Sequence, residues 1–128
     1  MIILLETSTP VCRLTLFEGD ERHDYEWKAG RTLAKGLLEF LQTKLRENGR
    51  QWSDVTGLGV FEGPGSFTGL RIGLTVMNTL ADGLGVPIVG ARGEDWIESA
   101  VTSLQNGENQ RIILPFYGQG ANITQPRK

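Results

Sequence analysis

A dense group of glycines lies between an apolar run and a helical pattern, at residues 61–73, FEGPGSFTGLRIG. A glycine loop between a strand and a helix can hold a phosphate, because free backbone N–H groups lie at the positive end of the helix. The P-loop pattern fails, since Leu70 and Arg71 follow Gly69 where lysine and serine or threonine are needed. The dinucleotide pattern GxGxxG also fails, because position 68 is Thr68. The loop is therefore only a weak phosphate candidate.

Residues for metal or nucleophilic chemistry are sparse. His23 is the one histidine and Cys12 the one cysteine, so a zinc site has no ligand set. Ser66 follows a glycine, but the nucleophile-elbow pattern GxSxG is absent. We expect Ser66 to cap the following helix instead. The sequence thus predicts no catalytic residue, no metal and no cofactor.

A third candidate is a phosphate site on the first hairpin, of the kind that actin-like proteins build from an aspartate followed by glycine. Here the segment is ETSTP, residues 6–10, with Glu6 in place of the aspartate and no glycine. The backbone approaches a phosphate less easily without glycine. A structural role is favoured, in which Thr7 and Ser8 cap a turn.

The elements that must position these residues follow from periodicity and turn signals. We expect strands at residues 1–6, 11–19, 22–27, 55–61 and 86–91, and helices at 31–48, 66–84 and 94–104. Tight turns join the first three strands, which should be antiparallel, whereas helices separate the later strands, which should run parallel to the first. The predicted fold is α/β and ribonuclease H-like: a mixed five-stranded sheet with helices on its faces. We assign residues 1–105 to this domain and residues 106–128 to a C-terminal tail.

Charge and composition limit the partners and the compartment. The 128 residues carry a net charge of −2, so a basic footprint for nucleic acid alone is missing. A single cysteine fits a reducing compartment. The opening apolar run ends at Glu6 and is too short for a signal peptide or membrane span. We therefore expect a cytoplasmic protein that meets RNA only through a partner.

The second helix is apolar over an arc of roughly 220°, about twice what one sheet face requires. Gly69 and Gly73 are four residues apart and share a face, which would allow a close helix neighbour. Two arrangements remain open. Either the sheet and the first helix supply both neighbours, or a partner's helix packs on the second side.

The glycine stretch GPGSFTGLRIG, residues 63–73, resembles the signature of the TsaB family, also called YeaZ. The likeness extends to the opening strands, IILLETSTPVCRLTLFEG at 2–19, and to LADGLGVPIVGA at 80–91. It covers about residues 1–100.

This resemblance implies an actin-like, ribonuclease H-type fold and a protein that is not itself a catalyst. TsaB proteins bind and support TsaD, which transfers a threonylcarbamoyl group to the adenosine beside the anticodon of tRNA, and the ATPase TsaE joins the complex. The family contact is a helical bundle of the first two helices, with TsaD or with a second TsaB. Together with the two-sided helix, it predicts a partner interface at Leu33, Leu37, Leu41, Phe67, Gly69, Leu70, Arg71, Gly73, Leu74 and Met77. The motif loop comprises Gly63, Pro64, Gly65, Ser66, Phe67, Thr68 and Gly69.

Two departures from the family pattern stand out. Glu6 occupies the usual aspartate position, which weakens any nucleotide role. The family's second lobe is missing, while ILPFYGQGANIT at 113–124 resembles the last segment of the long form, with Gln119 in place of an arginine. The chain is therefore expected to be internally shortened.

The sequence supports one hypothesis with two rivals. The hypothesis is a non-catalytic scaffold for TsaD in tRNA threonylcarbamoylation. One rival is a small actin-like nucleotide hydrolase, and the other is a homodimeric module without a TsaD role.

Overall fold

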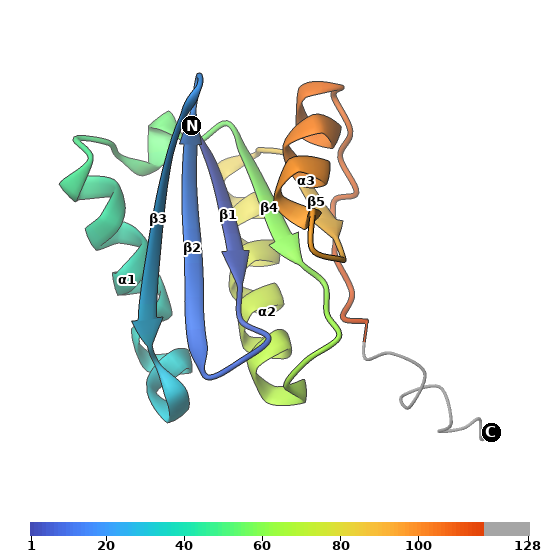
Figure 1. Cartoon of the computed structure of the whole chain (residues 1–128). Helices are drawn as coiled ribbons and strands as arrows, with labels where there is room; N and C mark the ends of the chain where they lie inside the picture. The colour runs from blue at the N-terminus through green and yellow to red at the C-terminus, as the bar shows by residue number, and fades with distance from the viewer. Residues whose placement is uncertain (117–128) are drawn as a thin grey trace.

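The core of the fold is a mixed five-stranded sheet in the order β3-β2-β1-β4-β5, seen in a computed structural model that describes residues 1–116 (Figure 1). The strands are β1 (Ile2–Glu6), β2 (Val11–Glu18), β3 (Glu21–Lys28), β4 (Gly57–Phe61) and β5 (Ile88–Ala91). β1–β2 and β2–β3 pair antiparallel, and β1–β4 and β4–β5 pair parallel. The predicted ribonuclease H-like topology is confirmed.

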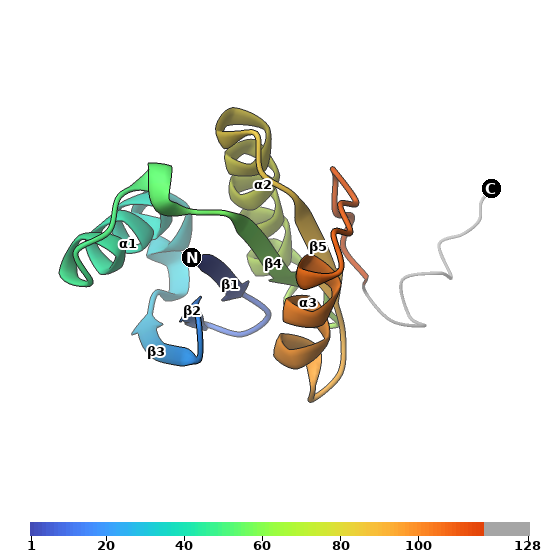
Figure 2. The same ribbon diagram turned by 90° about the horizontal axis from the view of Figure 1, so that it is seen from above.

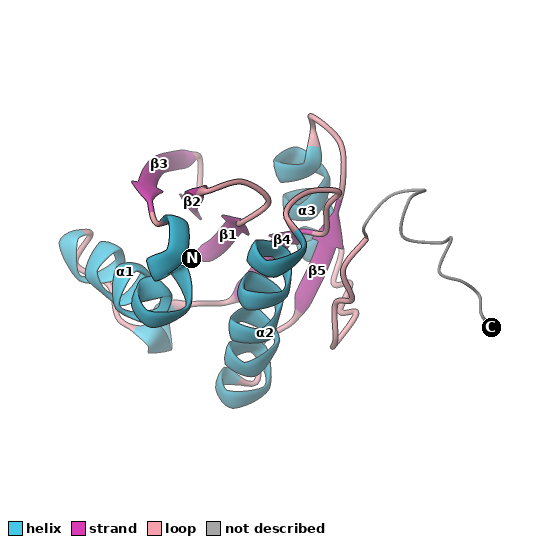
Figure 3. Ribbon diagram, turned by 90° about the horizontal axis from the view of Figure 1, so that it is seen from below, coloured by secondary structure: helices cyan, strands magenta, loops and turns pink. Residues whose placement is uncertain are grey.

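Helices cover the two faces of this sheet unequally. α1 (Leu33–Glu47) and α2 (Phe67–Leu84) lie on one face, and α3 (Trp96–Gln105) lies on the other against β4 and β5 (Figures 2 and 3). Short 3₁₀ turns, η1 (Gly30–Thr32) and η2 (Trp52–Asp54), flank α1. All three helices occur where the sequence predicts them. Within residues 1–116, no helix has the combined length and apolarity needed to cross a bilayer.

The i, i+4 leucine pattern of α1 explains its position. Leu33, Leu37, Leu41 and Leu45 are at most 5% exposed and fill the core between α1, α2 and the sheet. β3 also packs against α1, because the ring centroid of Trp27 in β3 lies 5.1 Å from that of Phe40 in α1. Along β3 the half-buried Tyr25 and Trp27 alternate with exposed residues. His23 lies exposed on that strand, 3.7 Å from a carboxylate oxygen of Glu21.

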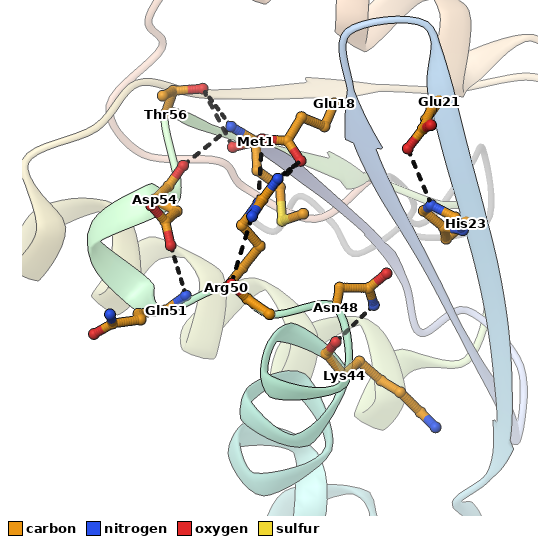
Figure 4. A network of polar contacts seen from close by, with 11 residues as sticks. Met1, Glu18, Glu21, His23, Lys44, Asn48, Arg50, Gln51, Asp54 and Thr56 are labelled. Carbon is orange, nitrogen blue, oxygen red and sulfur yellow. Dashed lines mark hydrogen bonds and ion pairs between the residues drawn. The ribbon is translucent and has the colours of Figure 1, made fainter.

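The connection from α1 to β4 is held by a polar corner (Figure 4). Arg50 Nη2 lies 2.8 Å from Glu18 Oε1 at the end of β2. The amino group of Met1 donates to the carbonyl oxygen of Asp54 at 3.0 Å, and Thr56 N donates to the carbonyl oxygen of Met1 at 2.7 Å. These contacts fix where β4 enters the sheet beside β1.

Residues 109–116, called the edge strap below, cover the outer edge of β5. Gln110 N donates to the carbonyl oxygen of Ile88 at 2.9 Å, and Ile88 N donates to Asn109 Oδ1 at 3.1 Å. The Asn78 side chain binds the backbone of Ile113 twice, with Nδ2 donating at 3.0 Å and Oδ1 accepting at 2.9 Å. An uncovered edge strand invites pairing with other chains, and the strap satisfies this edge. Of the segment that resembles the end of the long form, Gln119 lies outside the described residues.

Ile113 itself is 2% exposed and belongs to the same core as α1 and α2. Replacing Asn78 with alanine leaves its two backbone partners without the bonds that hold Ile113 in place. We expect Asn78→Ala to lower the free energy of unfolding by about 1–3 kcal/mol, measured by chemical denaturation. Thr79→Ala, an exposed change one residue along α2, is the control and should stay within about 0.5 kcal/mol of the wild type. Equal stability of the two variants would contradict this role of Asn78.

Candidate functional site

The motif loop joins β4 to α2 and packs directly on the connection between β1 and β2. Ser66 N donates to the carbonyl oxygen of Ser8 at 2.8 Å. The Thr7 hydroxyl donates to the carbonyl oxygen of Gly69 at 2.7 Å. Ser66 also caps α2 as predicted, because its Oγ accepts from Gly69 N at 3.2 Å. Two loops that are about sixty residues apart in sequence are thus fastened together, and we call this contact the loop joint.

Glycines make the loop joint possible. A Cβ built at Gly65 would lie 2.4 Å from Ser8 Cβ, and one at Gly69 would lie 2.3 Å from the carbonyl oxygen of Thr7. A Cβ at Gly73 would lie 2.2 Å from Thr7 Oγ1. The expectation that Gly69 and Gly73 admit a partner's helix is therefore wrong. Their common face is occupied by the chain's own β1–β2 connection.

The loop joint also places the residues considered for phosphate binding. Thr7 bonds to α2 rather than capping a local turn, while the Ser8 hydroxyl donates to Glu6 Oε2 at 2.6 Å. Arg71, the nearby cation, has its guanidinium carbon 5.3 Å from the ring centroid of Phe67. An anion is disfavoured here, because the Glu6 carboxylate repels it and the two loops are already in direct contact.

Nucleophile and metal candidates lie elsewhere. Cys12 is buried in the core, and burial raises the pKa of its thiol to about 12, so the thiol is protonated at neutral pH. His23 is exposed on β3, which is an edge strand of the sheet. Across residues 1–116, no three side chains of the metal-ligating types come together.

Most of the predicted interface residues are inside the chain. Seven of them are buried: Leu33, Leu37, Leu41, Leu70, Gly73, Leu74 and Met77. Five of these residues belong to the core that α1 and α2 share with the sheet, because the i, i+3 and i, i+4 spacings put them on the inward stripe of each helix: Leu33, Leu37, Leu41, Leu74 and Met77. Gly69 is half-buried, and Phe67 and Arg71 are exposed.

The wide apolar arc of α2 is divided between two internal neighbours. Its buried stripe faces the sheet, and Ile72, Val76 and Leu80 are half-buried against the core that α1 shares. One large apolar side chain on each of these helices is more than half exposed: Leu38 of α1, 51% exposed, and Phe67 of α2, 55% exposed. We call the outward side of α1 and α2, with these five residues, the helical face. Leu38 was not among the predicted interface residues. The available signal was its position outside the stripe formed by residues 33, 37, 41 and 45.

A cavity of about 370 Å³ opens at one end of the helical face, between the starts of α1 and α2. Its lining is Thr9, Pro10, Gly30, Arg31, Leu33, Ser66, Thr68, Gly69 and Ile72. The loop joint therefore forms one wall of this pocket, which we call the joint pocket. Sequence reasoning missed it, because its walls come from three separate segments.

Comparison with known proteins places this geometry in context. Residues 27–106, more than half of the chain, match the family model described as TsaD, tRNA N6-adenosine threonylcarbamoyltransferase. The chain is 32% identical over 109 residues to the tRNA threonylcarbamoyladenosine biosynthesis protein TsaB of Haemophilus influenzae, covering 84% of this chain and 46% of the relative. It is 30% identical over 89 residues to TsaB of Escherichia coli, covering 70% of this chain and 38% of the relative.

Solved structures agree with these sequence matches. YeaZ from Pseudomonas aeruginosa superposes with a TM-score of 0.68 at 28% identity, covering 83% of this chain and 49% of that protein. The chain thus spans less than half the length of the relatives it matches.

The tightness of the loop joint can be tested with two glycines of the same helix. Gly73→Ala forces a Cβ onto Thr7 and should destabilise the protein by about 1–3 kcal/mol. Gly83→Ala meets no atom within 4 Å and should stabilise it by up to about 1 kcal/mol through helix propensity. The measurement is the thermal midpoint of each variant. A Gly73→Ala protein as stable as the wild type would show that the joint tolerates a methyl group.

Proposed function

This chain belongs to the TsaB (YeaZ) family, and its residues 27–106 also match the TsaD family model. On that premise we propose that it is a non-catalytic partner subunit. It binds and supports a TsaD-like protein in threonylcarbamoylation of the adenosine next to the anticodon of tRNA. The curated relatives are named for threonylcarbamoyladenosine biosynthesis on tRNA, which supports the pathway. The chain meets tRNA only through the complex, in the cytoplasm.

The helical face is the observation that carries the proposal. Leu38 and Phe67 are more than half exposed, with half-buried Ile72, Val76 and Leu80 in the same pair of helices. Large apolar side chains that stay exposed on a folded domain are typical of a protein interface. A partner would meet this outward surface rather than Leu74 or Met77, which are already buried.

The loop joint weighs against the nucleotide hydrolase. In that rival the β1–β2 connection and the motif loop would have to part to admit a phosphate. Here Ser66 and Ser8, and Gly69 and Thr7, are hydrogen-bonded across the gap, and Glu6 adds negative charge. ATP turnover by the purified chain that disappears in Glu6→Gln would favour the hydrolase instead.

A second copy is the other candidate for the helical face, because identical apolar surfaces can bind each other about a twofold axis. We also propose a TsaE-like ATPase as a further partner, and the family resemblance is its one support. The homodimer and the TsaD complex would compete for Leu38 and Phe67 if both form.

Light scattering coupled to size-exclusion chromatography tests this proposal directly. The chain is measured alone and mixed with the TsaD-like protein of the same organism. We expect a mixed complex, and Leu38→Glu should weaken it by about tenfold or more, since a charge replaces an apolar contact. Leu114→Glu, a change at a 73% exposed position on the edge strap, is the matched control and should leave binding unchanged.

Three outcomes are informative in this experiment. A mixed complex sensitive to Leu38→Glu alone supports the proposal. A homodimer that ignores the TsaD-like protein contradicts it in favour of the homodimeric module. Equal effects of both substitutions would place the interface away from the helical face.

A further inference from the structure

The segments that begin α1 and α2, which contribute walls to the joint pocket, carry basic residues in an otherwise slightly acidic chain. Lys28, Arg31 and Lys35 are the only charged residues between positions 28 and 38, and Arg71 is the only one between 63 and 81. The whole chain carries a net charge of −2, so positive charge is segregated here. All four side chains belong to exposed residues.

Few carboxylates accompany these cations, and the nearest one along α1 is Glu39, four residues after Lys35. Among the described residues 1–116, the ion pairs involve other side chains, and neither Arg31 nor Lys35 takes part in one. The pairs that do form lie at the sheet, at the far end of α1 and at Glu62. Arg31, which lines the pocket, therefore has no ion-pair partner within this part of the chain.

The joint pocket combines that charge with an apolar floor. Pro10, Leu33 and Ile72 supply apolar lining, Arg31 lies among the lining residues, and Thr68 adds a hydroxyl. A cavity of about 370 Å³ is large enough for one aliphatic or aromatic side chain. An apolar floor gives a nucleic-acid phosphate nothing to contact, whereas a protein side chain fills it.

A second copy of this chain is a poor occupant on electrostatic grounds. In an antiparallel arrangement the far end of α1 would approach, and it brings Lys44, Arg46 and Arg50. Glu47 and Glu18, the carboxylates of that end, are already paired with Lys44 and Arg50. Within the described residues of α1 and α2 this leaves Glu39 and Asp82 to face several cations.

We propose that the joint pocket seats an apolar side chain of the partner protein, flanked by partner carboxylates that pair with Arg31 and Lys35. This inference rests on the proposed function, since it names the chemistry of the partner segment that meets one end of the helical face. Exposed charges act mainly on complementarity and association, and their effect falls with salt. The partner segment is thus acidic and carries an apolar anchor.

Charge reversal tests the proposal with matched variants. Arg31→Glu changes an exposed residue that lines the pocket, and Lys35→Glu changes an exposed residue four positions further along the chain, in the first turn of α1. Arg46→Glu makes the same change on an exposed residue at the other end of α1. Affinity for the TsaD-like protein is measured by titration calorimetry at about 50 and about 300 mM salt. We expect Arg31→Glu and Lys35→Glu each to weaken binding by about tenfold at low salt, with less effect at high salt, and Arg46→Glu by less than about threefold.

The outcomes separate this inference from the proposed function. Absence of any binding by the wild type overturns both. Binding that Arg31→Glu and Arg46→Glu weaken equally, or not at all, overturns the acidic-segment inference and leaves the partner role intact. Self-association, or binding of purified tRNA to the chain alone, that is lost in Arg31→Glu would assign the pocket to a second copy or to RNA, and would also overturn it. Unchanged thermal midpoints check that each variant is folded.

Discussion

The contact between the β1–β2 connection and the start of α2 is the constraint on which the rest of this structure depends. Thr7 and Ser8 reach the backbone of the motif loop only because Gly65, Gly69 and Gly73 lack side chains. Once that contact is made, the rotation of α2 about its axis is set. Leu70, Leu74 and Met77 then face the sheet, and Phe67 and Arg71 face outward. The helical face and the joint pocket both follow from this single rotation.

The two outer strands of the sheet are protected in different ways. β3 is an edge strand rich in charged residues, which discourages pairing with another chain. β5 has no charged residue and is covered by the edge strap, whose Asn109 and Gln110 side chains bond to backbone N–H groups of β5. With one edge charged and the other covered, neither edge of the sheet is a favourable site for pairing with another chain.

A phosphate-binding loop and the loop joint both depend on glycines, but the glycines serve different purposes in the two. Glycines let a backbone approach closely, whether the approaching group is a phosphate or another loop. In this chain Ser66 Oγ accepts from Gly69 N in the first turn of α2, and the carbonyl oxygen of Ser8 accepts from Ser66 N. These two N–H groups are therefore already bonded within the protein, which fits a structural role for the motif.

What the sequence by itself determined was the order and type of the elements, because they depend on local periodicity. The leucines of α1, the alternation of β3 and the Ser66 cap are all properties of neighbouring residues. The spacing of Gly69 and Gly73 also indicated a close approach on one face of α2. Only the tertiary structure decided that Thr7 is the group that approaches, that seven predicted interface residues are buried, and that Leu38 and the joint pocket are exposed. Helical periodicity defines which residues share a face but not what covers it, because the neighbour comes from a distant segment brought there by chain topology.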